Sequence, residues 1–158
     1  MSDSSLILLL DEVRHKTLEL LEDVTEKQAR WSPVGLQNSI LWHAGHCYIL
    51  LEWLTSQAIG AEPTCLPGWF EMFSWASRPV EIEPHEWPPL ETVVYELRLQ
   101  HGRVRKVIGH LPEERLTSPA LGRPERTPRF LIVHALHDEA CHSGEIWLLR
   151  KMLAASAR

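Results

Sequence analysis

Two segments of this chain repeat their apolar residues at alternating steps of four and three, the spacing of one face of a helix packed in a bundle. The first predicts a helix over residues 5–24, with a stripe of Leu6, Leu10, Val13, Thr17, Leu20 and Val24. The second predicts a helix from about residue 89 to Pro112, with a stripe of Leu90, Val94, Leu97, His101, Val104, Ile108 and Leu111. Stripes of this kind need other helices to cover them, so the chain is restricted to helical-bundle folds.

Two further helices carry local start signals. One opens at Asn38 or Ser39, both good N-caps, and runs to about Gln57. It is apolar on nearly all sides, which predicts burial. The other starts at Thr127-Pro128, a cap followed by proline, and runs to about Ala154.

The segments between these helices are irregular. Residues 25–35 predict a short helical turn followed by a loop, and a polar loop is expected after Pro112. Residues 58–88 are rich in proline and aromatic residues, which predicts a crossover with one short helix near 69–76. The order helix, helix, long crossover, helix, helix predicts an all-α four-helix bundle, with residues 1–158 as one domain.

Composition argues against some classes of function and some cellular locations. The net charge of −5 argues against nucleic acid, and the densest basic cluster, Arg103, Arg105 and Lys106, reads as a solvated helix face. No stretch approaches the roughly 20 apolar residues that cross a bilayer. The N-terminus lacks the basic leader of a signal peptide, so we expect a cytoplasmic protein. Three cysteines do not suggest a disulfide framework.

Potential metal ligands recur at intervals of four near the C-terminus: His134, Asp138 and His142. Residues four apart lie nearly above one another on a helix, so Asp138 and His142 can converge on one ion. His46 on the second helix is a natural third ligand, because facing helices of a bundle commonly hold metals between histidine and carboxylate. Zinc, nickel, cobalt and iron(II) all accept such ligands.

Other histidines are alternatives for this site. His43 could replace His46, but it lies about 60° away around the helix. His134 could hydrogen-bond to Asp138 or coordinate directly. His137 is five residues from His142 and points elsewhere, which favours a supporting or surface position.

The residues around these ligands also suggest roles. Glu139 and Glu145 are candidate general bases, although either could be an ordinary solvated helix residue. Cys47 and Cys141 flank the predicted ligands, and we expect both to be buried, inert thiols. Trp42, Trp53 or aromatic residues of the 69–75 segment could wall a pocket.

At these residues the chain resembles the DinB/YfiT-like superfamily of metal-dependent four-helix-bundle proteins. Residues 38–46, Asn-Ser-Ile-Leu-Trp-His-Ala-Gly-His, resemble its second-helix motif, whose last histidine is a metal ligand. Residues 137–146 resemble its fourth-helix motif, in which two ligands four apart precede a Gly-Gln/Glu step. The resemblance implies His46, Asp138 and His142 as the ligands. It departs from the common pattern at Asp138, where most members have histidine.

The resemblance also implies thiol chemistry, such as transfer of bacillithiol or mycothiol-dependent isomerisation. We therefore expect a metal-dependent enzyme that uses zinc, nickel or iron and a low-molecular-weight thiol as an S-transferase on a small-molecule substrate. The alternatives are a metal-dependent hydrolase, a non-enzymatic metal- or ligand-binding stress protein, and a structural homodimer with a vestigial site. Relatives pair through bundle helices, so a homodimer through exposed apolar residues of the first and third helices is expected in any case.

Overall fold

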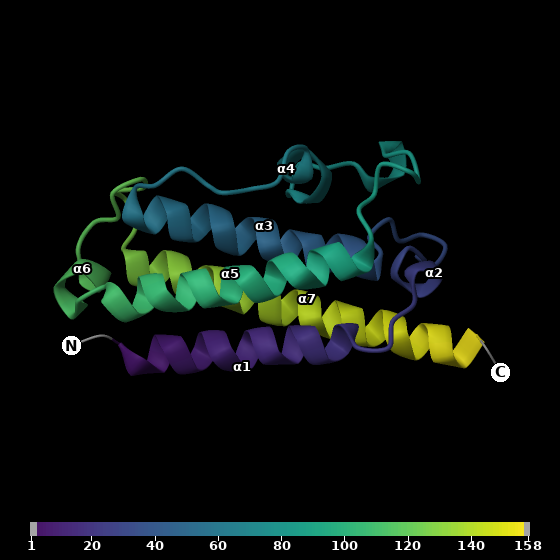
Figure 1. Ribbon diagram of the computed structural model, residues 1–158, viewed down its shortest axis with the longest axis horizontal. Coiled ribbons are helices and arrows are strands. Elements are labelled where there is room, and N and C mark those ends of the chain that lie inside the picture. Colours follow the sequence, from purple (N-terminus) through teal and green to yellow (C-terminus); the bar gives the residue numbers. More distant parts are fainter. Residues whose placement is uncertain (1–2, 157–158) are drawn as a thin grey trace.

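Four long helices lie side by side along the molecule (Figure 1). They are α1 (Ser4–Leu21), α3 (Ile40–Ile59), α5 (Leu90–His110) and α7 (Pro128–Ser156). The structure, a computed structural model, describes residues 3–156 without the side chain of Val80; over that range it contains helices and no β-strand. The predicted all-α bundle with a long crossover between its second and third long helices is confirmed.

Short helices occupy the connections. α2 (Glu26–Ala29) and α4 (Trp69–Phe73) lie where short helical segments were predicted, and a 3-10 turn, η1 (Pro79–Glu81), follows in the crossover. A further helix, α6 (Glu113–Thr117), forms where the sequence predicted only a polar loop. The side chain of Leu116 is fully buried there, so tertiary packing stabilises a segment whose local signal is weak.

Helix ends follow capping residues, with small shifts from prediction. The cap of α1 is Asp3 rather than Ser4 or Ser5, because its carboxylate accepts hydrogen bonds from the Ser5 and Leu6 amides. α1 ends three residues earlier than predicted, just before Asp23, which has a left-handed backbone (φ 58°). α3 begins after the predicted cap Ser39, whose hydroxyl accepts from the Trp42 amide.

The helix α3 is buried over most of its length, as its apolar sequence predicted. It packs against α7 and α5, and α4 covers its remaining side. Close approach of α4 depends on Gly45, because a Cβ atom there would overlap the ring of Phe73, which is fully buried. The crossover carrying α4 lies along α3 (Figure 1).

A buried polar cluster ties three of the long helices together. The guanidinium of Arg14, on α1, forms two hydrogen bonds with the Glu139 carboxylate on α7, of 2.8 and 2.9 Å. It also donates to the Leu97 carbonyl and to the Gln100 side chain on α5. Arg14 and Glu139 are 0% and 1% exposed, so water contributes almost nothing to satisfying them. The ion pair fixes how α7 is rotated in the bundle.

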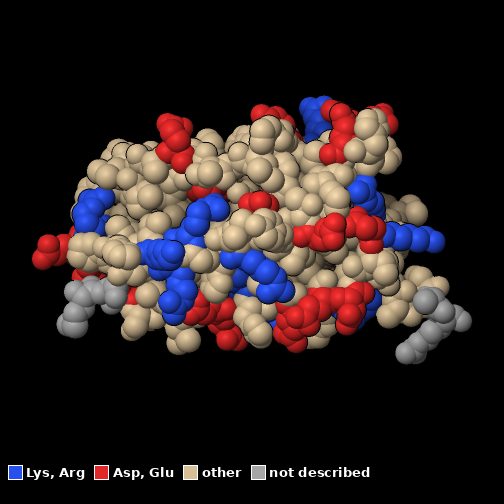
Figure 2. All heavy atoms as spheres, in the orientation of Figure 1, with Lys and Arg blue, Asp and Glu red and all other residues tan. Residues whose placement is uncertain are grey.

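Charged side chains of both signs share the face shown in Figure 2, with basic residues prominent along α5. Two of them are paired: Arg103 with Glu52 at 2.7 Å and Arg105 with Asp11 at 3.1 Å. This matches the predicted solvated helix face. None of the helices described, over residues 3–156, has the length and apolar character needed to cross a membrane.

Candidate metal centre

His46 from α3 and Asp138 and His142 from α7 converge where the two helices face each other. The Asp138 Oδ2 atom lies 3.2 Å from the Nε2 atom of His142 and 3.5 Å from that of His46. One potential ligand atom from each residue lies within 4.8 Å of the other two. The structure thus brings together the three residues that the sequence singled out.

The orientation of His46 is set from the crossover. Its Nδ1 atom lies 2.7 Å from the Phe73 carbonyl oxygen, a hydrogen bond that requires the proton on Nδ1. The Nε2 lone pair is then free to face Asp138. Trp42 stacks on the same ring, with centroids 4.7 Å apart, and its indole N–H donates to the Ser77 hydroxyl. The crossover therefore orients one ligand directly through the Phe73 carbonyl and indirectly through Ser77, which holds the stacked indole.

The Asp138 Oδ2 atom is shielded from solvent and has no well-directed hydrogen bond, although two imidazole nitrogens lie within ion-pair distance of it. A buried carboxylate oxygen without a partner is costly. Donor atoms around a tetrahedral ion with bonds of about 2.0–2.1 Å lie about 3.3 Å apart, which is close to both measured separations. The residues present therefore fit a divalent transition metal.

Neighbouring charges shift the pKa values of two of the three ligands. Burial opposes ionisation of Asp138, but the neighbouring imidazoles of His142 and His46 hold the pKa of its carboxyl well below the usual range. Burial disfavours the charged form of His142 too, yet Asp138 and Glu145 raise its pKa above the ordinary value. Asp138 is an anion near neutral pH, the form that binds metal.

A second group of potential ligands shares His142. Its Nδ1 atom lies 2.8 Å from both Glu145 Oε2 and His43 Nδ1, and the last two atoms are 2.9 Å apart. Burial, with the imidazoles of His142 and His46, lowers the pKa of His43 to about 3, so this ring is neutral. His43 approaches Nδ1 of His142 and Asp138 approaches Nε2, so these two residues face opposite sides of the His142 ring.

The profile of the DinB superfamily matches residues 9–146, which include all of these side chains. The chain belongs to the DinB superfamily. The crystal structure of a conserved protein from Enterococcus faecalis is similar in fold, with a TM-score of 0.79 and 20% sequence identity over 98% of this chain and 99% of that one. No curated protein matches this chain.

In this member of the DinB superfamily, the alternative ligands His134 and His137 lie outside the site. His134 is exposed and stacks on Phe130, with ring centroids 5.9 Å apart. His137 is exposed as well, and its Nε2 atom lies 4.0 Å from the sulfur of Cys141. Spacing alone placed His134 in one column with Asp138, but the rotation of α7 turns it to the surface.

Two expectations about neighbouring residues need correction. Cys47 is buried as expected, and burial raises its pKa well above the ordinary value. Cys141 is exposed instead, because one residue before His142 is about 100° around the helix. Glu139 is bound to Arg14 in the core and is not available as a base, whereas Glu145 contacts His142.

The partnership of the Phe73 carbonyl with His46 in this DinB-superfamily chain was not predicted from the sequence. A backbone carbonyl carries no residue-type signal, so only the fold could reveal it. The pairing of Glu145 with His142 did have a signal, since residues three apart on a helix are neighbours.

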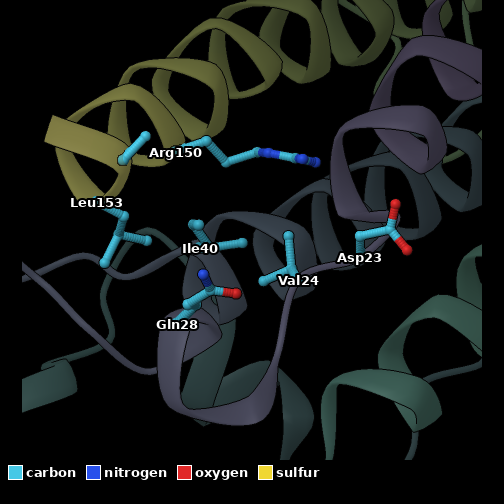
Figure 3. Close-up of a pocket in the computed structure, with 7 residues that line it drawn as sticks. Asp23, Val24, Gln28, Ile40, Arg150 and Leu153 are labelled. Atoms are coloured by element: carbon cyan, nitrogen blue, oxygen red, sulfur yellow. The ribbon is translucent and has the colours of Figure 1, made fainter. Parts of the chain in front are cut away.

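A hollow of about 210 Å³ lies between the C-terminal part of α7 and the α1–α3 connection (Figure 3). It shares no residue with the metal cluster. Its one basic side chain, Arg150, donates to the Leu20 and Glu22 carbonyls at the end of α1. Because that charge already caps a helix, the hollow does not compete with the metal cluster as the functional site of this DinB-superfamily chain.

Proposed function

We propose that this chain is a metal-dependent enzyme in which His46, Asp138 and His142 bind one divalent transition metal: zinc, nickel or iron. The observation that carries the proposal is the buried Asp138 oxygen, which lies between two imidazole nitrogens without a hydrogen bond. Carboxylate and imidazole are ligands that all three metals accept. Aspartate in place of the commoner third histidine reduces the net charge of the loaded site.

The reaction we propose is S-transfer from a low-molecular-weight thiol to a small electrophile. When bound, the metal lowers the pKa of a coordinated thiol or water. Three protein ligands leave a position for an exogenous group. Cys47 is buried and burial raises the pKa of its thiol, so this residue does not supply a thiolate. Trp42 shields the His46 ring from water on one side.

Metal content is the first test of the proposal. Protein purified without chelator or histidine tag should contain one ion per chain. Asp138→Asn, which keeps the shape of the side chain, should lose that ion, while Asp11→Asn on the bundle surface should keep it. An ion retained at full occupancy by Asp138→Asn would contradict the ligand assignment.

Turnover is the second test. Metal-loaded protein is incubated with bacillithiol, mycothiol or glutathione and a panel of electrophiles. Conjugation should exceed the uncatalysed rate and disappear in metal-free protein and in Asp138→Ala. Hydrolysis of a test ester or amide, without thiol dependence, would reassign the protein as a hydrolase. A stoichiometric ion without either activity would favour a metal- or ligand-binding stress protein.

The remaining parts of the proposal are a small-molecule substrate, a cytoplasmic location and a homodimer. The net charge of −5 supports a partner other than nucleic acid. The homodimer is argued below from the surface of α7.

A further inference from the structure

The two ring nitrogens of His142 face different surroundings. Its Nε2 atom faces Asp138 at 3.2 Å, and its Nδ1 atom faces Glu145 at 2.8 Å. Both Glu145 and His43 have side chains that could bind a metal, so the group of His43, His142 and Glu145 is a candidate second ion site. The distances decide between an ion and a hydrogen bond.

Separations within the second group match hydrogen bonds. The two separations to Glu145 Oε2 are 2.8 and 2.9 Å, inside the usual N–H···O range of about 2.7–3.2 Å, and the two imidazole nitrogens are 2.8 Å apart. Ligand atoms around one tetrahedral ion would be about 3.3 Å apart, which lies between the two Asp138 separations of 3.2 and 3.5 Å. Glu145 Oε2, unlike Asp138 Oδ2, also has a hydrogen-bond partner. The second group is therefore a hydrogen-bonded cluster.

The chemistry of imidazole links the two groups. A neutral ring has one lone pair, so His142 can bind an ion through Nε2 only if its proton is on Nδ1. A carboxylate accepts hydrogen bonds and cannot donate them when ionised. Glu145 at 2.8 Å therefore selects the tautomer whose Nε2 lone pair faces Asp138. The Phe73 carbonyl likewise accepts the Nδ1 proton of His46 and leaves the Nε2 lone pair of that ring facing Asp138.

We propose that Glu145 is a positioning residue: it accepts the Nδ1 proton of His142 and holds that ring for metal binding, without binding the ion itself. This inference rests on the proposed metal site. Partners of this kind commonly change metal affinity by about 10- to 100-fold. The Glu145 side chain is 54% exposed, which places the expected effect nearer to tenfold because water competes for the same bond.

The experiment compares Glu145→Leu, Glu145→Gln and the matched exposed glutamate variant Glu12→Gln. Dissociation constants for Zn²⁺ and Co²⁺ are measured by competition with a chromophoric chelator. Glu145→Leu should weaken binding about tenfold or more. Glu145→Gln, whose amide oxygen still accepts, should recover part of that loss, and Glu12→Gln should match the wild type.

Two readouts separate positioning from general stability. The visible spectrum of the Co²⁺ protein should shift in Glu145→Leu, because the His142 ring is less constrained. The melting temperature of the metal-free protein should change no more than in Glu12→Gln.

Equal affinity in the wild type and Glu145→Leu would overturn the inference and leave the proposed metal site intact. Loss of one of two bound ions in Glu145→Leu would also overturn it, in favour of a second ion site. A wild type that binds no ion would overturn the metal site itself and this inference with it.

Discussion

Asp138 and Glu139 are neighbours in the sequence and have opposite roles in the structure. Asp138 lies between the two imidazoles at the α3–α7 seam, whereas Glu139 is buried against Arg14 on the other side of α7. One residue of helix is about 100° of rotation, so adjacent carboxylates face different partners. The ion pair in the core and the candidate metal centre are therefore coupled through a single helix orientation.

Replacement of Arg14 by methionine should destabilise the protein strongly. The change leaves the Glu139 carboxylate buried without its partner, a situation that typically costs about 3–5 kcal/mol. Arg105→Met, which removes a surface pair with Asp11, should cost within about 1 kcal/mol. Chemical denaturation of both variants measures the difference. Arg14→Met combined with Glu139→Leu should recover much of the loss, and equal effects of the two single variants would contradict this account.

At the scale of secondary structure, the start of α1 and the packing of α4 help to position side chains in and around the metal cluster. The cap at Asp3 sets where α1 begins, and α1 carries Arg14. The short helix α4 packs on Gly45 and presents the Phe73 carbonyl to His46. Each of these small features can be tested by one substitution.

Asp3→Ala should destabilise the protein by about 1 kcal/mol near neutral pH, because α1 loses its N-cap. A hydrogen bond from the Ser5 hydroxyl lowers the pKa of Asp3 below the ordinary 3.8. Between the two pKa values the unfolded chain binds more protons at Asp3 than the folded chain does. The free energy that the Asp3 cap contributes to stability is therefore complete above pH 3.8 and is lost as the pH falls through the lower pKa of the folded state. The stability difference between wild type and Asp3→Ala should shrink from pH 7 to pH 2. Asp3→Asn, a cap that does not titrate, should keep its advantage over Asp3→Ala in acid.

Gly45→Ala should destabilise the contact between α3 and α4. The new Cβ atom would overlap the Phe73 ring, and overpacking of this kind costs about 1–3 kcal/mol. Displacement of α4 should also loosen the Phe73–His46 hydrogen bond and weaken metal binding. Gly102→Ala on α5 meets no atom within 4 Å and should stabilise the protein by about 0.5–1 kcal/mol. Thermal denaturation and metal titration of both variants are the measurements, and a Gly45→Ala protein as stable as Gly102→Ala would refute the packing argument.

At the scale of the whole molecule, a bound ion would link α3 to α7 at the seam where these helices pack most extensively. A ligand that binds only the folded state stabilises it by about 2.7 kcal/mol at a hundredfold excess over its dissociation constant. Removal of the ion should therefore lower the melting temperature by roughly 5–11 °C for a chain of this size. The helical circular dichroism should persist, because the apolar core does not depend on the ion. Identical melting curves before and after chelation and metal refilling would contradict the link.

The homodimer remains a prediction, and we propose α7, rather than the first and third long helices, as its contact. Between residues 130 and 148, α7 exposes four large apolar side chains: Phe130, Val133, Trp147 and Leu148. Glu145 is the one carboxylate exposed in the same stretch. In the proposed dimer, a two-fold axis between residues 140 and 141 would pair Val133 with Leu148 and His137 with Gly144.

Sedimentation should therefore show a species of twice 18.2 kDa. Trp147→Glu should convert it to monomer, whereas Tyr95→Glu on α5 should not. Mild oxidation should cross-link the dimer through Cys141, the exposed cysteine near that axis. A single 18.2 kDa species at high protein concentration would refute the dimer.

The sequence by itself determined the four long helices and the three converging residues of the site. Periodicity and capping are local properties, so the stripes through Leu10 and Leu97 and the cap at Ser39 could be interpreted without the fold. The spacing of Asp138 and His142 is local as well, and the motif containing His46 supplied the third position.

Only the tertiary structure decided which side of α7 faces α3. That rotation depends on the Arg14–Glu139 pair and on side-chain packing between helices far apart in the sequence. It placed Cys141 at the surface, where burial was expected, and it excluded the alternative of His134 as a ligand. It also brought the Phe73 carbonyl to His46 from 27 residues away, a contact with no pattern in the sequence because every residue has a carbonyl. Helix formation depends on nearby residues, whereas the orientation of a ligand depends on whatever distant group the packing brings beside it.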